Sequence, residues 1–544
     1  MNQQQVSKIK PQFCFYKRID GSRSFREFFS KKYKHLSKLK VIKSSNEQNH
    51  RRIPILHKLS ASVKSLDLSQ YGLLEKYTRS HIKLVAKKFL KITKFSSFHN
   101  KEGSKSFLLT KIMLKKAKNL KYLCLKAIFD DSSCDHLLHL ISRIKLKAID
   151  LISIFSPRFD PAKLLDCLNC LPSSIEELCL YCKFQTETNR NFSIKHLENL
   201  QKLELGMLLN INTFMSLIKS IQDPSKLKTL RFQLINFDEF GASDIQKFLE
   251  SCLNLEELKI QTELDVYPMS LMKLKKLTLG STEHGLLRII PFIQQQRESL
   301  ESLSLTLIFY NANLKDELFE GLKLLKKLKK LKLNIKVENS FVNALDLTEL
   351  IEALEYLEEV DLMGLLIDFK DDNSFEKFCK ALKKRSESLT SIKLPFNGFK
   401  MNKRASSLFV QTLSLLPELK HITFKDFGVE DAGFYNELRE IVCFKNANLN
   451  EVILDKVKGE KITTCWESLI EMLKAIISKP KMKQFCYLEV PHHGSASDLK
   501  DLKILNFHYD VREEVSHFDY LHLVSYACNP SFYYWDLDFH KWAA

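Results

Sequence analysis

The chain has 544 residues, of which 44% are hydrophobic and 27% are charged, and its formal net charge at pH 7 is +19. No apolar run approaches the roughly 18 residues that a membrane-spanning helix needs, so we expect no transmembrane segment. The charge is uneven, because residues 1–126 hold 31 Lys and Arg against 6 Asp and Glu, whereas the remaining residues hold 53 against 59. Such a basic front end predicts an anionic partner: nucleic acid, an anionic membrane or an acidic protein.

Residues 1–60 form a basic N-terminal segment with 15 Lys and Arg against 3 Asp and Glu. Within it, Ser24 and Glu27 have the spacing of a capping box, and the apolar residues that follow recur at helical spacing. This pattern predicts an amphipathic helix over residues 24–40, which either caps the open end of the domain that follows or docks on a partner or membrane surface. The side chains predicted to bind the anionic partner are Arg26, Lys31, Lys34, Lys38, Arg51 and Arg52.

An internal repeat follows this segment. Its clearest copy has apolar residues at Leu389, Ile392 and Leu394 and an asparagine at Asn397. This spacing predicts a short strand whose inward side chains stack on those of neighbouring copies. The middle apolar residue recurs at Leu66, Leu123, Ile149, Leu178, Leu203, Leu230, Leu258, Leu277, Leu303, Leu331, Val360, Ile392, Ile422, Val452 and, weakly, Phe485. The long step from Leu66 to Leu123 leaves room for one more copy, near Ile92 to Phe95.

This recurrence resembles the leucine-rich repeat family, and the long repeats resemble its helix-backed class, of which ribonuclease inhibitor is the familiar member. The resemblance implies an α/β solenoid over residues 61–505, with about 15–16 repeats. A curved parallel β-sheet would line its concave side and helices its convex side. The asparagine position departs from the family pattern, since it is apolar in other copies: Ile128, Ile154, Leu208, Ile235 and Leu365. Backbone groups or water must satisfy the turns of those copies.

Helices are expected between the strands wherever apolar residues recur three and four positions apart, as in residues 243–253, 286–297, 316–328, 347–357 and 374–384. The lysine-rich stretch 321–333 looks like a nucleic-acid patch, but its leucines keep the repeat spacing. We interpret it as a repeat junction with leucines inward and lysines solvated. Past Phe485 the pattern loosens, and a last shortened strand is expected at Leu502, Leu505 and Phe507. The aromatic-rich residues 506–544 are predicted to be the C-terminal cap.

The 13 cysteines are odd in number and scattered, which favours a reducing, intracellular setting, cytoplasmic or nuclear. Two CxxC pairs, Cys167 with Cys170 and Cys179 with Cys182, could supply four thiolates to zinc. The repeat pattern argues against this, because it places Cys179 on the concave strand face and Cys167 in the preceding helix. The histidine pair His492–His493 matches no ligand spacing either. We therefore expect no metal and no cofactor.

The sequence contains no glycine-rich phosphate loop, GxSxG elbow or HExxH motif, and we predict a binding protein without enzyme activity. The concave face is the expected protein-binding surface, because stacked strands present their outward side chains on a rigid frame. Mixed charge on this face suits a protein better than a nucleic-acid backbone. The predicted contact residues are Lys202, Glu204, Arg231, Glu257, Lys259, Lys276, Lys330, Lys332, Glu359, Asp361 and Lys393.

Two other functions stay open at this point. An RNA- or DNA-associated protein would bind nucleic acid through its basic front end and protein through its repeats. The resemblance also suggests a substrate-recognition subunit of a ubiquitin ligase, since repeats of this kind often follow an F-box. Residues 1–60 show no convincing F-box, which would need two or three packed apolar helices. A GTPase-activating role, known in some members of the family, would need a loop arginine near the first repeats, and Arg51, Arg52 and Arg79 are unremarkable.

Overall fold

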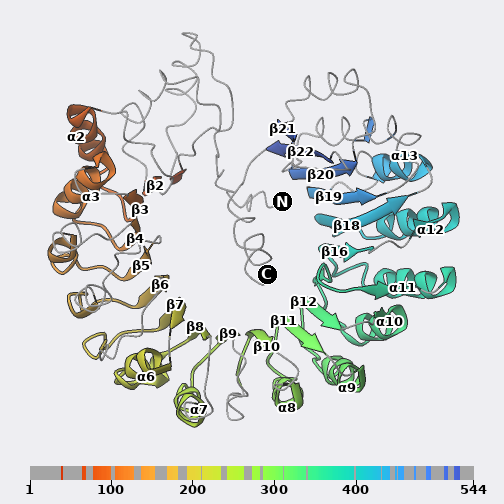
Figure 1. Ribbon diagram of the computed structural model, residues 1–544, viewed down its shortest axis with the longest axis horizontal. Coiled ribbons are helices and arrows are strands. Elements are labelled where there is room, and N and C mark those ends of the chain that lie inside the picture. Colours follow the sequence, from red (N-terminus) through yellow and green to blue (C-terminus); the bar gives the residue numbers. More distant parts are fainter. Residues whose placement is uncertain are drawn as a thin grey trace, which may run out of the picture. The chain divides into compact units, whose positions relative to one another are not determined.

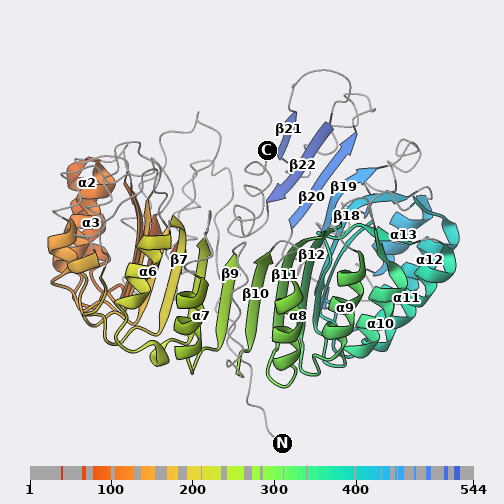
Figure 2. The same cartoon turned by 60° about the horizontal axis from the view of Figure 1, so that its bottom comes forward.

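The computed structural model describes most of the repeat region and short stretches near both ends of the chain (Figures 1 and 2). The described residues are 38–40, 64–68, 78–99, 104–127, 137–153, 168–181, 193–209, 211–234, 242–261, 273–281, 286–309, 312–337, 341–369, 371–396, 400–429, 432–441, 448–449, 451–458, 468, 471–472, 485–491, 508–511 and 520–526. The chain divides into an N-terminal unit, residues 1–237 and 251–254, and a C-terminal unit, residues 238–250 and 255–544.

In the N-terminal unit, parallel strands pair one after another in chain order from β1 to β8. The helices of this unit lie on one side of its strands (Figure 1). The elements are β1 (Lys38–Lys40), β2 (Ser65–Leu68), α2 (Arg79–Lys88), β3 (Lys94–His99), α3 (Lys105–Lys116), β4 (Tyr122–Ala127), β5 (Ala148–Ser153), β6 (Glu177–Tyr181), β7 (Lys202–Leu209), α6 (Ile211–Lys219), η2 (Pro224–Lys226) and β8 (Thr229–Leu234).

The middle apolar residues of the repeat form one buried row across these strands. Successive register partners in this row are at most 1% exposed: Leu66, Phe95, Leu123, Ile149, Leu178, Leu203 and Leu230. Burying each such side chain stabilises the fold by about 1.5–3 kcal/mol. The row confirms the predicted strand positions, and Phe95 confirms the further copy expected near Ile92 to Phe95.

That further copy has a polar residue at its third inward position. Ser97 is fully buried, and its hydroxyl lies 2.9 Å from Oγ1 of the equally buried Thr110 in α3. The two hydroxyls satisfy one another, which offsets the cost of burying them. Because the position is a serine, this copy does not show the apolar repeat signature, although its strand and its place in the sheet are those of the others.

Strand β1 corrects the end of the helix predicted over residues 24–40. It pairs in parallel with β2, and Leu39 is the register partner of Leu66. The remainder of that predicted helix lies outside the described residues. Leu36, Leu39 and Val41 have the apolar spacing of the repeat as well as that of a helix face. Pairing with β2 favours the strand, because it also satisfies the backbone groups on that edge of β2, which a helix over residues 38–40 would leave without a backbone partner.

The C-terminal unit repeats the same arrangement, with its helices on one side of its parallel strands (Figures 1 and 2). Its elements are α7 (Ala242–Ser251), β9 (Glu257–Gln261), β10 (Lys276–Ser281), α8 (Leu286–Gln295), β11 (Ser302–Phe309), α9 (Ala312–Lys323), β12 (Lys330–Val337), β13 (Val342–Asn343), α10 (Ala344–Ala353), β14 (Glu359–Asp361), β15 (Ile367–Asp368), α11 (Asp372–Lys384), β16 (Ser391–Pro395), β17 (Lys400–Met401), α12 (Lys403–Ser414), β18 (His421–Val429), α13 (Ala432–Glu440), β19 (Glu451–Lys458), β20 (Phe485–Pro491), β21 (His508–Val511) and β22 (Tyr520–Tyr526).

The buried row of this unit also consists of the predicted residues. Its register partners are at most 2% exposed: Leu258, Leu277, Leu303, Leu331, Val360, Ile392, Ile422 and Val452. The five predicted helices correspond to α7 through α11. Helix α9 ends before the predicted boundary, because Leu325 and Leu328 are buried in the turn that leads to the next strand. No described helix has the length and apolarity to span a membrane.

One described turn shows how a repeat manages without its asparagine. Leu365 holds that position and is buried, and its N–H donates to the carbonyl of Leu362 at 2.9 Å. The N–H of Met363 donates to Asp361 Oδ1 at 3.2 Å. A Cβ on Gly364 would lie 2.1 Å from Asn334 Oδ1, so this turn requires glycine. A backbone bond, as predicted, and an aspartate side chain, which was not predicted, therefore replace the asparagine in this turn. The asparagine of the clearest copy, Asn397, lies outside the described residues.

The C-terminal strands pair differently from the strands of the repeats. Strand β20 begins at Phe485, but it pairs antiparallel with β22, and β22 pairs antiparallel with β21. An antiparallel partner requires the chain to reverse direction, whereas each leucine-rich copy returns the chain through a crossover to a parallel strand. The strands β20, β22 and β21 are therefore not successive copies of the repeat, and the predicted end of the repeats at residue 505 stays a prediction. Leu502, Leu505 and Phe507 lie outside the described residues, and the capping role of residues 506–544 stays a prediction.

Candidate functional site

The outward residues of the parallel strands define a surface that we call the open strand face, opposite the helices. In the N-terminal unit this face includes the predicted contact residues Lys202 and Glu204 on β7 and Arg231 on β8. Glu204 and Arg231 are register partners, so their side chains emerge side by side from neighbouring strands. The predicted contact residues of this unit are therefore brought together.

Glu204 is the centre of a dense polar group on this face. Its side chain is 13% exposed, and its carboxylate lies 3.2 Å from Arg231 Nη1 and 3.4 Å from Lys202 Nζ. The hydroxyl of Tyr181 donates to Oε1, and the thiol of Cys179 donates to Oε2 at 3.6 Å. Four donors from three strands thus surround one carboxylate, which fixes their side chains in place.

A second carboxylate lies on the strand next to Cys179. Asp150 on β5 accepts a hydrogen bond from the hydroxyl of Tyr122 on β4. Lys94 on β3 places its ammonium 5.3 Å from the centre of the Tyr122 ring, within cation–π range. We call the six residues at the centre of this surface the tyrosine–carboxylate cluster: Tyr122, Asp150, Cys179, Tyr181, Glu204 and Arg231.

Gly206 makes room for the tyrosine of this cluster on β6. A Cβ at position 206 would lie 2.1 Å from Cδ1 of the Tyr181 ring. The ring therefore lies across the β7 backbone in a space that only glycine leaves free. Any larger residue at this position would displace Tyr181 and break its bond to Glu204.

Burial and the carboxylates set the protonation states in the cluster. Burial, reinforced by Asp150, raises the pKa of the Tyr122 hydroxyl well above its ordinary value, and burial with the bond to Glu204 does the same for the pKa of Tyr181. Burial also raises the pKa of the Cys179 thiol, with Asp150 adding to it. Burial opposes ionisation of Glu204, but Tyr181, Arg231 and Lys202 outweigh it and lower the pKa of this carboxyl. At neutral pH the cluster holds protonated tyrosines, a neutral thiol and an ionised glutamate.

In the C-terminal unit the predicted contact residues form smaller and more exposed pairs. Lys330 on β12 pairs with Glu359 on β14, and Lys393 on β16 lies 3.4 Å from Asp361. Lys332 is the register partner of Asp361. The remaining predicted residues of this unit lie on β9 and β10, where Glu257 and Lys276 are register partners and Lys259 follows two positions later.

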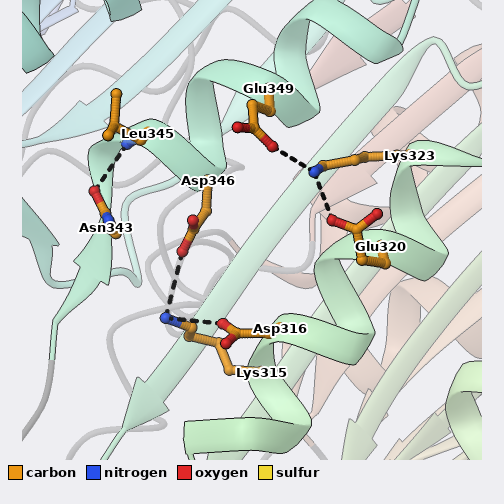
Figure 3. Close-up of polar contacts among 8 residues, drawn as sticks. All are labelled: Lys315, Asp316, Glu320, Lys323, Asn343, Leu345, Asp346 and Glu349. Carbon is orange, nitrogen blue, oxygen red and sulfur yellow. Dashed lines mark hydrogen bonds and ion pairs between the residues drawn. The ribbon is translucent and has the colours of Figure 1, made fainter.

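The charges on the helix side of the C-terminal unit are joined across repeats (Figure 3). Lys315 of α9 lies between Asp316, at 3.3 Å, and Asp346 of α10, at 3.4 Å. Lys323 of α9 likewise lies 2.6 Å from both Glu320 and Glu349 of α10. Related pairs continue along the same side: Lys384 with Glu352, Lys380 with Glu376, and Arg404 with Glu376. The contacts of Lys315, Lys323, Lys384 and Arg404 connect neighbouring helices, whereas Lys380 and Glu376 both belong to α11.

Both units therefore build each described repeat from an inward apolar row, an outward strand row and a return segment on the other side. The chain has the leucine-rich repeat fold. No family model matches it, and the search of curated proteins found no match. Among solved structures it is similar to the leucine-rich repeat protein LegL7 from Legionella pneumophila, with 17% identity and a TM-score of 0.30 over 64% of this chain and 96% of that one. It is also similar to yeast Rad7, solved in complex with Elc1, with 14% identity and a TM-score of 0.35 over 68% of this chain and 76% of that one.

Four residues of the cluster were not predicted as contacts: Tyr122, Asp150, Cys179 and Tyr181. Each occupies an outward position of its leucine-rich repeat, next to a buried leucine or isoleucine. Strand alternation alone could have identified them, and it did place Cys179 on this face. The prediction missed the others because it selected charged residues of the later repeats, whereas this surface depends on tyrosines paired with carboxylates.

The predicted contacts to an anionic partner are mostly outside the described part of the chain. Lys38 belongs to β1, and the other five, Arg26, Lys31, Lys34, Arg51 and Arg52, are not described. Their role stays a prediction.

The candidate zinc ligands are only half described. Cys170 is exposed in a turn and Cys179 is buried in β6, whereas Cys167 and Cys182 lie outside the described residues. Among the described residues, no three His, Cys, Asp or Glu side chains are grouped so that they could hold a metal ion.

Proposed function

We propose that this leucine-rich repeat protein is a binding scaffold without catalysis of its own, and that its protein partner docks on the open strand face of the N-terminal unit. The tyrosine–carboxylate cluster would form the centre of the contact. The observation that supports this proposal is the fixing of two tyrosines and an arginine by two carboxylates on an otherwise open sheet. Tyrosine and arginine are enriched among the residues that dominate binding energy at protein interfaces.

Preorganisation strengthens this proposal. Tyr181 and Arg231 both contact Glu204, so their rotamers are restricted before a partner arrives. A partner then loses less conformational entropy on binding, because side chains that would otherwise be immobilised are already held. The two rings also present apolar area beside polar edges, which suits a protein surface with mixed chemistry.

The protonation states favour binding over catalysis. A nucleophilic cysteine needs a depressed pKa, whereas the pKa of Cys179 is raised by burial. The carboxyl of Glu204 has a lowered pKa and is surrounded by donors, so it is a poor general acid or base near neutral pH.

The role in a ubiquitin ligase and the cytoplasmic or nuclear location stay predictions. The segment that would hold an F-box lies outside the described residues, apart from residues 38–40.

The test is affinity capture from nuclease-treated native extract, followed by binding of the recovered partner to purified protein. We expect Tyr181→Ala combined with Arg231→Ala to weaken that binding at least tenfold, since each removes a side chain of the cluster. The matched control combines Lys330→Ala with Lys393→Ala, which removes two cations from the open strand face of the C-terminal unit.

The control should bind the partner as the unaltered protein does. Equal losses from both double variants would show that the partner does not single out the cluster. Unchanged binding by the Tyr181 and Arg231 variant would show that the cluster is a packing feature of the sheet. Circular dichroism of each variant confirms that the repeats remain folded.

A further inference from the structure

A second surface lies on the helix side of the first repeats. The described ranges 78–99 and 104–127 contain 13 Lys and Arg and no Asp or Glu. They comprise the strands β3 and β4 and the neighbouring helices α2 and α3, which are in contact and lie side by side in Figure 1. The density of positive charge predicted for the front end of the sequence therefore extends well into the folded repeats.

Helix α2 concentrates its cations on the side that faces solvent. Arg79, Lys83 and Lys87 are all exposed and recur at intervals of four residues, which places them in one stripe. The opposite side is fixed in the core, where Ile82 and Val85 are at most 1% exposed. At 1.5 Å per residue, the stripe extends about 12 Å along the helix axis.

Helix α3 adds a second stripe beside the first. Lys111 and Lys115 are four residues apart, and Lys118 follows in the turn after the helix; Lys115 and Lys118 are exposed, and Lys111 is partly exposed. The inward side of α3 contains Phe107 and Met113, which are both buried. Packed helices lie about 8–10 Å apart, so the two stripes have about that separation.

We propose that this basic face, formed by Arg79, Lys83, Lys87, Lys111, Lys115 and Lys118, binds the phosphate backbone of double-stranded nucleic acid. The proposal is independent of the open strand face. Two rows of cations about 8–10 Å apart can contact phosphates on both sides of a duplex groove, since the grooves of B-DNA are about 6 Å and 12 Å wide. Lysines that contact phosphates position a duplex without reading its sequence, so little base preference is expected.

The residue types on this face favour a duplex over single strands. Binding of single strands relies on aromatic side chains that stack on the bases. Helix α2 contains no Phe, Tyr or Trp, and the one aromatic ring of α3, Phe107, is buried.

The same residue types argue against two other anionic partners. A helix that lies in a membrane surface inserts an apolar face, but the apolar faces of α2 and α3 are in the core. Among the described side chains of α2 and α3, Leu84 alone is large, apolar and substantially exposed, at 44%. An acidic protein would be expected to meet an interface rich in aromatics and arginine, whereas lysine is depleted in interface cores.

The experiment compares full-length protein with a variant in which Lys83, Lys87, Lys115 and Lys118 are all changed to Glu. The matched control changes Lys326, Lys327, Lys383 and Lys403 to Glu, which are exposed lysines of the C-terminal unit, so both variants lose the same net charge. The probes are a 20-base-pair duplex DNA and the same duplex as RNA, a single-stranded oligonucleotide, phosphatidylserine vesicles and polyglutamate, each titrated between about 50 and 200 mM salt.

We expect the basic-face variant to bind both duplexes at least tenfold more weakly than the control. The slope of log affinity against log salt should fall by about 3–4 for DNA, because each lost phosphate contact contributes about 0.9. A second variant with Lys→Gln at the same four positions should lose a smaller part of the affinity while keeping the helices intact. Duplex affinities within twofold of the control for both variants would overturn the proposal. So would tighter binding of the unaltered protein to vesicles, single strands or polyglutamate than to duplex.

Discussion

The helices of the two units differ in the charges that they carry. In the C-terminal unit, the helices α9 to α12 together carry both signs of charge, and lysines and an arginine join carboxylates of neighbouring helices (Figure 3). In the N-terminal unit, α2 and α3 carry no acidic residue. Among the described residues of this unit, the most buried ion pairs lie instead on the open strand face, around Glu204.

This difference separates charges that hold repeats together from charges available to a partner. The core makes no such distinction, because the buried rows of both units consist of the same kinds of residue at the same register. Paired surface charges contribute modestly to stability, whereas a face of one sign repels itself and attracts counter-ions. The comparison therefore predicts equal responses to changes in the core and opposite responses to changes on the helices.

The largest effect should come from the core, and it should be the same in both units. Leu178→Asp and Leu303→Asp each bury an unpaired charge at a position that is at most 1% exposed. We expect each to cost about 4 kcal/mol or more of unfolding free energy, measured by chemical denaturation. Leu324→Asp, at a residue that is 42% exposed, is the control and should change stability by less than about 1 kcal/mol. A variant with a charged core residue and an unchanged denaturation curve would contradict the repeat assignment.

The next effect concerns the charges on the open strand face. Glu204→Gln removes the partner of Arg231 and Tyr181, and we expect it to destabilise the N-terminal unit by about 1–3 kcal/mol at pH 7. Because the folded pKa of Glu204 is lowered, its contribution is present above its ordinary pKa of 4.5 and is lost as the pH falls through the folded value. The deficit of the variant should therefore shrink below about pH 4.5. Glu359→Gln, in a more exposed pair, is the control; a Glu204→Gln deficit independent of pH would rule out this electrostatic origin.

The same substitution should have opposite signs on the helices of the two units. Lys323→Glu replaces the partner of Glu320 and Glu349 with a like charge, and we expect a loss of about 1 kcal/mol. Lys83→Glu instead introduces a carboxylate four residues from both Arg79 and Lys87, which should stabilise α2 by about 0.5 kcal/mol. Denaturation curves of the two variants measure both effects. Destabilisation of similar size by both would mean that the basic face is not self-repelling.

The smallest effect is the response to salt. Raising the salt concentration screens repulsion among the cations of α2 and α3 and also weakens the ion pairs between α9 and α10. We expect changes of about 0.5 kcal/mol with opposite signs, resolved by hydrogen exchange of peptides from each helix. Peptides of α2 should become better protected as salt rises, and peptides of α10 less well. Changes of the same sign in both regions would remove the proposed contrast.

The apolar spacing by itself determined the repeat architecture. A residue such as Leu303 is flanked by other inward residues at fixed offsets, and its strand neighbours repeat those offsets, so local pattern and tertiary packing impose the same constraint. The spacing located even a degenerate copy. The long step from Leu66 to Leu123 predicted a strand near Phe95, although the third apolar position of that copy is Ser97. It was ambiguous at Leu39, where helix and repeat spacings coincide, and only the pairing with β2 decided for a strand.

Tertiary structure alone decided which outward residues meet. Glu204 and Arg231 are 27 residues apart in the sequence, and their contact depends on the register of β7 and β8. Tyr181 reaches Glu204 because Gly206 leaves space for its ring, and no pattern along the chain predicts that space. The reason is physical: inward positions are selected for one shared property, apolarity, which is visible in any single copy. Outward positions are not constrained in this way, so their chemistry follows from which strands become neighbours and how closely they approach.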